Sequence, residues 1–512
     1  MMLMMMMMMM TGGGVGQGLR GLRNAAATTG KSPRCMETVS VKVRDRCERV
    51  EKELFSALVL LCGSSGREGV RPLAVGGFVR DKLLGRRCAD LDVCLTRLDI
   101  AETAGLLGEC RRFRPIYVSA RAAIAGDTAT YRFDDRLNVD FSPLKTLASS
   151  SNSPAFAYSS ISTAADPLVM DALLRDFTIN SMVYDMAAER VEDPTGQGLD
   201  DLEEGLLRTP VSPREALQSD PIRAFRALRL ASSLGLRLDD GLWREMLDKE
   251  LEASAVRMVH VSRLDQELRR GFSGPDPARY ARLLASSKLF KAPLACWQLD
   301  DDDLQSAPTA AAVVGLACSL LPPPHRPWTQ LLAVFVCPLI QCSSPQTATR
   351  LVELLRARHF PKDALRSLDR LFRCSLLPLD ISDPSQLADW LIHAGEDHWR
   401  MALCLGYAAK RQHLPLDTLS FLEARCSPLL RAGPSLDGAA MVRLFPVLQQ
   451  HQALIKVALR KLLRFELTSV LSSQSLPQSQ ALHSFLALTI DQIVSEANQS
   501  KKATPETNEL KS

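Results

Sequence analysis

The chain has 512 residues, of which 46% are hydrophobic, and a formal net charge of only +4. This length exceeds what one hydrophobic core can hold, so three or four packed units are expected, and the small net charge excludes nucleic-acid binding by bulk charge alone. The 13 cysteines include no Cys-x-x-Cys pair, which excludes a zinc-finger framework, and the apolar runs at 309–321 and 331–340 are shorter than the roughly 20 residues of a membrane span.

The first 36 residues stand apart by composition. They open with a run of methionines, are rich in Gly, Ala and Thr, and contain four basic residues with no acid before Glu37. An acid-free basic leader is typical of a transit peptide for the mitochondrion or plastid. A disordered or wrongly included extension is the alternative. A second start at Met36 is also predicted, and it would give a cytoplasmic or nuclear form without the leader.

Residues 37–190 are predicted to contain both helices and strands. An amphipathic, charged helix covers about 41 to 62, and Leu73, Ala74 and Val75 end a strand. Gly76 and Gly77 then form a turn without side chains that can cradle a phosphate, and a short helix follows it.

Two aspartates open the next predicted strand. Side chains two residues apart on a strand point to the same face, so Asp90 and Asp92 project together. Two like charges on one face are costly unless a cation lies between them, and Mg²⁺ is usually held by one or two carboxylates and the phosphates of a substrate. In a two-metal site one ion activates a hydroxyl and the other stabilises the leaving oxygen, which is nucleotidyl-transfer chemistry. A solvated strand edge is the alternative.

A third carboxylate would complete this site. Residues 137–141 alternate like a half-buried strand and include Asp140. Asp140 is therefore the third candidate catalytic residue, and a solvent-facing strand residue is the alternative.

Residues 171–182 contain polar side chains in an apolar run. Arg175, Asp176 and Asn180 stand among Phe177 and Ile179. The plainer interpretation is that Asp176 caps a helix and pairs with Arg175.

A basic stripe follows in the chain. Arg223, Arg226 and Arg229 recur every three residues and would lie along one helix, which can be simply a solvated face. Asp220 lies one turn before Arg223, however, so the two could offer an acceptor and donors to the edge of a base.

Five blocks in this order resemble the signature of the class II tRNA nucleotidyltransferase and bacterial-type poly(A) polymerase superfamily, whose best-known members are CCA-adding enzymes. The blocks are Gly76-Gly-Phe-Val-Arg-Asp with Asp90-Leu-Asp, residues 171–182, residues 193–210, residues 220–229 and the weaker residues 261–268. The resemblance implies an α+β fold: a polymerase-β-like nucleotidyltransferase head with a mixed sheet, followed by an all-α neck, body and tail.

The resemblance also implies roles for residues. Arg175 would hold a triphosphate, Asp176 a ribose hydroxyl, and Asn180 a phosphate or metal-bound water, while Asp220 and Arg223 would read the incoming base. The residues implied for nucleotide binding are Gly76, Gly77, Arg80, Arg175, Asp176, Asn180, Asp220, Arg223, Arg226 and Arg229. Arg80 could instead be an ordinary surface charge.

The activity implied is the template-independent addition of CCA to the 3′ end of tRNA from CTP and ATP, with Mg²⁺ held on Asp90 and Asp92 and pyrophosphate released. A poly(A) polymerase, an A-adding or CC-adding specialist and a non-catalytic RNA-binding protein remain alternatives. Two positions depart from the family pattern: Leu174 stands where an arginine is usual and Ser219 where an acid is usual. The second departure is expected to loosen the positioning of Arg223.

The predicted organisation is a leader at 1–36, a head at 37–190, a helical neck at 191–290, an all-α body and tail at 291–493, and a disordered tail at 494–512. Two basic stripes in the body are Arg366, Arg370 and Arg373, and Lys456, Arg460 and Arg464. They are either solvated faces or sites that grip the phosphates of a tRNA acceptor-T arm. No membrane partner is expected.

Overall fold

The computed structural model describes residues 43–88, 90–118, 128–146, 166–287, 289–296, 307–320, 328–339, 349, 352–353, 356, 362–376, 382–403, 416–450, 452–473 and 476–502. The chain divides into two compact units, Met1–Gln298 and Leu299–Ser512. The predicted transit leader, Met36, residues 147–165 and residues 503–512 lie outside the described residues.

The first unit contains a seven-stranded sheet with the order β3-β4-β5-β2-β1-β6-β7. Its strands are β1 (Pro72–Val75), β2 (Leu91–Leu95), β3 (Phe113–Val118), β4 (Ala129–Phe133), β5 (Leu137–Phe141), β6 (Val183–Asp185) and β7 (Arg190–Glu192). The pair β2–β5 is parallel and the other pairs are antiparallel, so the sheet is mixed, as expected.

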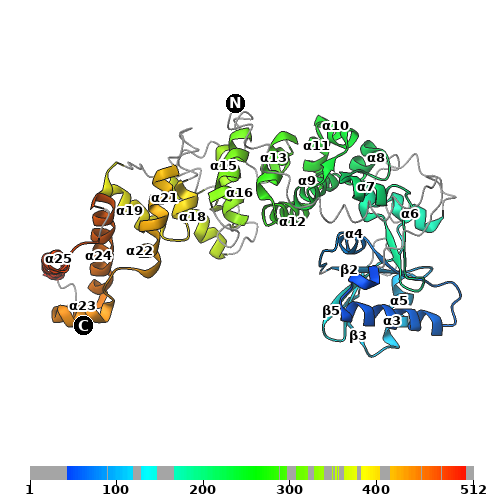
Figure 1. Cartoon of the computed structure of the whole chain (residues 1–512), viewed down its shortest axis with the longest axis horizontal. Helices are drawn as coiled ribbons and strands as arrows, with labels where there is room; N and C mark the ends of the chain where they lie inside the picture. Colours follow the sequence, from blue (N-terminus) through cyan, green and yellow to red (C-terminus); the bar gives the residue numbers. More distant parts are fainter. Residues whose placement is uncertain are drawn as a thin grey trace, which may run out of the picture. The chain divides into compact units, whose positions relative to one another are not determined.

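One face of this sheet forms the core of the head (Figure 1). It packs against α3 (Arg49–Ser64), α4 (Gly77–Leu83) and α5 (Ile100–Gly108), and a short turn of helix, η1 (Val43–Arg46), precedes them. Phe55 of α3 lies 6.1 Å from Phe78 of α4 between ring centroids. Alternate residues of β4 and β5, such as Phe133 and Phe141, are buried on this face, while Arg132 and Asp140 are exposed on the other. This period of two follows from the pleat of the strands.

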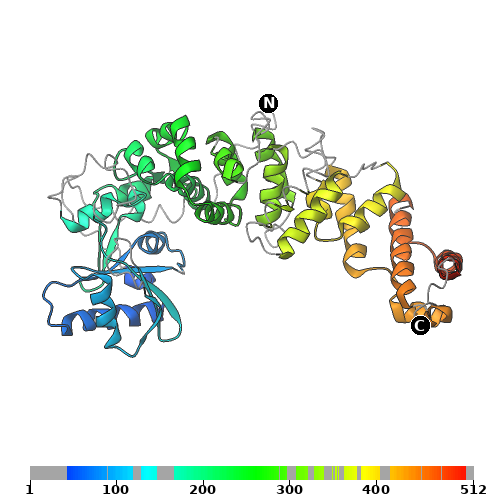
Figure 2. The ribbon, with the colours of Figure 1, turned by 180° about the vertical axis from the view of Figure 1, so that it is seen from behind.

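The remainder of the first unit is mostly helical. Its elements are α6 (Pro167–Leu173), η3 (Thr178–Asn180), α7 (Gly198–Glu204), β8 (Leu206–Leu207), α8 (Pro213–Ser219), α9 (Ile222–Leu234), β9 (Arg237–Leu238), α10 (Asp240–Met246), α11 (Lys249–Met258), α12 (Val261–Phe272), α13 (Pro277–Ser287) and α14 (Lys291–Cys296). The short parallel pair β8–β9 is a small departure from an all-α neck. Helix α9 contacts both α12 and α13, and its apolar side is buried. Figure 2 shows these helices, in green, from behind.

In the second unit the described secondary-structure elements are all helices. The elements are α15 (Ala307–Leu320), α16 (Trp328–Leu339), α18 (Lys362–Leu376), α19 (Pro384–Ala394), α21 (Leu416–Arg425), α22 (Ser427–Ala432), α23 (Gly438–Leu444), η6 (Pro446–Gln450), α24 (Gln452–Ser473) and α25 (Ser479–Lys502). Among the helices of the described ranges, none is long and apolar enough to cross a membrane.

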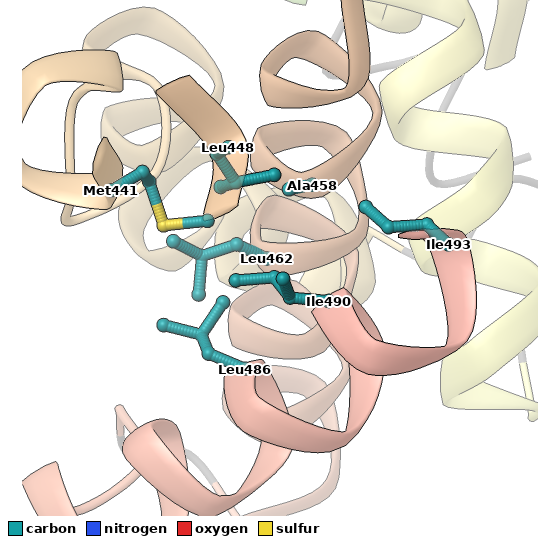
Figure 3. Close-up of a cluster of buried hydrophobic side chains, with 7 residues drawn as sticks. All are labelled: Met441, Leu448, Ala458, Leu462, Leu486, Ile490 and Ile493. Carbon is teal, nitrogen blue, oxygen red and sulfur yellow. The ribbon is translucent and has the colours of Figure 1, made fainter. Parts of the chain in front are cut away.

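The end of the second unit corrects one expectation. Residues 494–502 are not a disordered tail, because they continue helix α25. That helix is anchored by Leu486, Ile490 and Ile493, which recur at helical spacing and pack against Leu462 of α24 in a buried cluster (Figure 3). The polar composition after residue 494 therefore did not end the helix.

Candidate functional site

The glycine turn lies directly beside the first strand pair. Gly76 has φ +74°, a backbone conformation that favours glycine, and it joins β1 to α4. A Cβ atom on Gly76 would lie 3.2 Å from Asp92 Oδ2 and 3.5 Å from Arg175 Nη1. The missing side chain thus lets the turn approach Asp92 and Arg175 closely.

The predicted carboxylates gather on one face of the sheet. Asp92 of β2 is in register with Asp140 of the parallel strand β5, and Asp90 immediately precedes β2. Burial raises the pKa of the Asp92 carboxyl, and Asp140 and Asp90 add to this shift, whereas Arg175 and Lys145 oppose it. Asp140 is exposed and accepts a 2.6 Å hydrogen bond from Thr130 Oγ1. Like charges held this close together favour a bound cation.

These residues fit a magnesium site of the open kind. Within the part of the chain that the structure describes, no three His, Cys, Asp or Glu side chains form a ready metal cluster. Mg²⁺ usually takes one or two carboxylates from the protein and its other ligands from phosphates and water. The crowded pair Asp92 and Asp140 supplies the oxygen donors that such a site needs from the chain.

A polar network extends from the turn toward the neck. Arg80 is 8% exposed and donates from Nη1 to Asn180 Oδ1 at 2.6 Å, and Asn180 Nδ2 donates to Asp176 Oδ1 at 3.0 Å. Arg226 Nη2 of α9 lies 2.7 Å from Asp176 Oδ2. Burial disfavours the Asp176 carboxylate, but Arg226, the Asn180 amide, Arg223 and Lys145 together hold its pKa well below its ordinary value. Arg80 is therefore not an ordinary surface charge.

The plainer interpretation of the sequence paired Arg175 with Asp176, but the structure gives Arg175 another partner. It pairs with Asp171, from its Nε to Oδ2 at 2.7 Å, rather than with Asp176. The Asp171 side chain is 1% exposed and also accepts a 2.9 Å hydrogen bond from the backbone N–H of Lys145. Asp171 thus fixes both Arg175 and the chain segment that follows β5.

The two candidate base-reading residues are one turn apart but have separate partners. Asp220 Oδ2 accepts a 2.8 Å hydrogen bond from Arg263 Nη2. Arg223, which is 8% exposed, donates from Nη2 to the backbone oxygen of Leu174 at 2.8 Å. Ser219 is buried and donates to the oxygen of Ala216. Asp220 and Arg223 therefore do not contact each other through their side chains in this conformation.

Arg229 lies apart from the network around Asp176. It donates from Nε to Glu267 Oε2 at 2.6 Å, and Glu267 is 5% exposed. This pair joins α9 to α12, so the geometry gives Arg229 a structural contact, and its role toward a nucleotide stays a prediction.

Sequence reasoning missed Lys145, Asp171 and Arg263 as functional candidates. Lys145 keeps access to solvent, yet burial, together with Arg175 and Arg223, lowers its pKa to about 8, against the opposing effect of Asp176 and Asp171. Lys145 follows β5 without a periodic pattern, so nothing local marked it. Asp171 and Arg263 stand inside blocks already noted, but their partners are set by the fold.

The basic stripes of the second unit are partly paired. Arg373 of α18 contacts Asp369, and Arg464 of α24 contacts Asp389 at 2.5 Å. Their proposed contact with tRNA phosphates stays a prediction.

Comparisons with known proteins show what the head and the whole fold are similar to. Residues 73–208 match the model of the Poly A polymerase head domain. The chain is 30% identical over 236 residues to the mitochondrial CCA tRNA nucleotidyltransferase of Candida glabrata, covering 44% of this chain and 43% of that protein. It is 34% identical over 204 residues to Poly(A) polymerase I of Escherichia coli O157:H7, covering 39% and 42%. The chain thus spans less than half the length of each of these relatives.

Solved structures extend the likeness of the fold. The CCA-adding enzyme of Thermotoga maritima complexed with tRNA covers 89% of this chain and 99% of its own, with a TM-score of 0.60 and 16% identity. A CCA-adding enzyme in complex with CTP gives a TM-score of 0.60 and 15% identity over 89% and 99% of the two chains. Residues 73–208 are therefore similar to a Poly A polymerase head domain, within a chain whose fold resembles that of solved CCA-adding enzymes.

Proposed function

We propose that this protein adds CCA to the 3′ end of tRNA, using CTP and ATP and releasing pyrophosphate. The observation that carries the proposal is the position of Asp92, beside the Gly76 turn and in register with Asp140. Relatives named CCA tRNA nucleotidyltransferase and neighbours solved with tRNA or CTP support the choice of substrates.

The chain's own residues supply binding and orientation. The Gly76–Gly77 turn seats the triphosphate, and Arg175, Arg80 and Asn180 line its approach. Asp92 and Asp140, with Asp90 just before β2, would hold Mg²⁺, and the bound ion would supply activation of the attacking hydroxyl and charge neutralisation at the leaving oxygen. The 3′ hydroxyl oxygen of the RNA bonds to the α-phosphorus and its proton passes to solvent, while the bond to the bridging oxygen breaks and pyrophosphate leaves with that electron pair.

Base choice falls to Asp220 and Arg223 in this proposal. For Asp220 to meet a base, it must release Arg263, since its carboxylate oxygens are occupied by that guanidinium. Arg223 likewise gives two of its five N–H donors to the backbone oxygens of Ala216 and Leu174. On nucleotide binding, Asp220 and Arg223 would thus exchange their present hydrogen-bond partners for the edge of the base.

The N-terminal leader and the names of the yeast relatives bear on the localisation of the protein. We propose a mitochondrial form that depends on the basic leader and a second form that starts at Met36, supported by the mitochondrial names of the yeast relatives. Sequencing the N-terminal peptides of the mature protein tests this, and finding only uncleaved full-length chains would contradict it.

The test of activity uses purified full-length protein and a tRNA that lacks its 3′ CCA. With CTP and ATP together, three added nucleotides are expected, and CTP alone should give two. A long adenosine tail would instead identify a poly(A) polymerase, which remains the second candidate because of the 34% identity to Poly(A) polymerase I. Addition of only A or only C would identify a specialist.

A further inference from the structure

The glycine turn and Arg175 lie on one side of Asp92, the side toward β1. Gly76 and Arg175 both flank Asp92 on the β1 side, and the network of Arg80 and Asn180 continues from there. Under the proposed function the triphosphate lies on this side. In an in-line displacement the attacking and leaving oxygens stand on opposite sides of the phosphorus. The attacking hydroxyl must therefore reach Asp92 from the opposite side, across β5, β4 and β3.

One row of side chains crosses these strands in register. Asp92 of β2 pairs with Asp140 of β5, Asp140 pairs with Thr130 of β4, and Thr130 pairs with Tyr117 of β3. Directly opposed residues share a face of a sheet, and the hydrogen bond from Thr130 to Asp140 confirms this for the middle pair. With about 4.8 Å between strands, Tyr117 lies about 14 Å from Asp92 along the row.

Over β4 and β5 the row lies on the exposed face of the sheet, whereas over β1, β2 and β6 the same face carries the buried residues Val75, Cys94 and Val183. The alternate residues Tyr131, Val139 and Phe141 are buried, whereas Arg132 and Asp140 are exposed. We define the primer face as Tyr117, Thr130, Arg132 and Asp140, on the exposed side of β3, β4 and β5.

The chemistry of the primer face suits single-stranded RNA. Tyr117 is 57% exposed on the edge strand, whereas the other described tyrosines, Tyr131, Tyr184 and Tyr280, are at most 4% exposed. Arg132 donates from Nε to Asn138 Oδ1, so among the described residues its guanidinium meets an amide rather than a carboxylate. An exposed ring can stack on a base, and a guanidinium without an acid partner can meet a phosphate.

We propose that the primer face binds the last nucleotides of the single-stranded 3′ end of the RNA acceptor, with Tyr117 stacking on a base and Arg132 contacting a phosphate. This inference rests on the proposed function, because the direction of approach comes from the displacement at Asp92. Continuity with the carboxylates and the complementary charge of Arg132 favour RNA over a protein partner.

Cross-linking tests the path directly. A tRNA without CCA and with 4-thiouridine as its last nucleotide is bound to the full-length protein and irradiated, and the linked peptides are identified by mass spectrometry. Links to β3 or β4 are expected. Links confined to the neck or to the second unit would overturn the inference. If the same protein adds nucleotides to that tRNA, such a result leaves the proposed function standing; absence of any addition would sink the proposed function instead.

Substitutions give a second readout. Tyr117→Ala should raise KM for tRNA roughly fivefold or more, because one base-stacking contact is lost, while KM for CTP is unchanged. Tyr117→Phe, which keeps the ring, should retain the wild-type KM. Arg132→Ala should weaken tRNA binding and reduce its salt dependence by about one phosphate contact.

Arg87→Ala is the matched control, because its side chain is 95% exposed beyond the far end of α4. It should leave KM for tRNA unchanged, and thermal melting of every variant checks that the fold is kept. An unchanged KM for tRNA in both Tyr117→Ala and Arg132→Ala would overturn the inference.

Discussion

The carboxylates of the sheet and the charges of α9 are two charged regions of one unit with opposite character. Around Asp92, like charges are gathered, and the pKa of that carboxyl is raised by burial and by Asp140 and Asp90. On α9, Arg226 and Arg229 are each matched by an acid, Asp176 and Glu267. Like charges gathered in a half-buried place favour the binding of a cation, whereas matched pairs either stabilise the fold or can exchange partners when a ligand binds.

The largest expected effect comes from removing charge at the sheet. Asp92→Asn should lower nucleotide incorporation roughly a thousandfold or more, because the metal loses a ligand. The melting temperature should not fall, since a buried carboxylate crowded by like charges is removed. Incorporation assays and thermal melting measure both. Glu109→Gln, at an exposed position after α5, is the control; retained incorporation in Asp92→Asn would refute the assignment of the metal site.

Two substitutions can distinguish the roles of the two ion pairs of α9. Arg229→Ala removes the close partner of the buried Glu267 and leaves it only Arg270, at 3.9 Å, so the free energy of unfolding of the first unit should fall by about 3 kcal/mol. Arg226→Ala should instead raise KM for CTP and ATP, because Asp176 loses the cation that orders it. Denaturant titration and steady-state kinetics distinguish the two, and replacing Glu267 by Ala together with Arg229 should restore part of the lost stability. Equal effects of both substitutions on stability would contradict the division.

Lys145 lies close to charges of both regions, so its substitution tests how they act together. Lys145→Ala should raise KM for the triphosphates roughly tenfold with kcat less affected, because a cation beside Arg175 is removed. Burial, Arg175 and Arg223 lower the pKa of Lys145 to about 8 from 10.5, so nucleotide affinity should fall as pH rises through about 8.

The same shift has the opposite sign for stability. Between pH 8 and 10.5 the unfolded chain keeps a proton that the folded chain has lost, so this group makes stability rise with pH in that window. Titration of nucleotide affinity against pH, with Lys145→Ala as reference, measures the first effect. An identical pH profile in both proteins would rule out Lys145 as its source.

The smallest effect on stability is expected from Arg263→Ala. Its pair with Asp220 is half exposed, so the loss should be below about 1 kcal/mol. The ratio of CTP to ATP use should nevertheless change, since Asp220 is no longer held away from the base. Competition between the two labelled triphosphates gives the ratio, and an unaltered ratio would show that Arg263 does not restrain base choice.

Local patterns predicted much of the head. The glycine turn and the alternation of β5 depend only on near neighbours, and the structure has both where the pattern put them. Strand β2 begins at Leu91, so Asp92 lies in the strand and Asp90 just before it. The mixed sheet came from the family resemblance, and the pairings agree with it. The tail was wrong in part because polar composition alone does not show that Ile490 and Ile493 anchor a helix.

The sequence by itself determined which side chains could carry the chemistry, because residue type and short spacing decide what a strand or turn presents. Only the tertiary structure decided their partners. Asp171 holds the backbone of Lys145 from 26 positions away, Arg263 reaches Asp220 across 43, and Glu267 reaches Arg229 across 38. Electrostatic pairing over such separations depends on how the chain packs, and no local period encodes it.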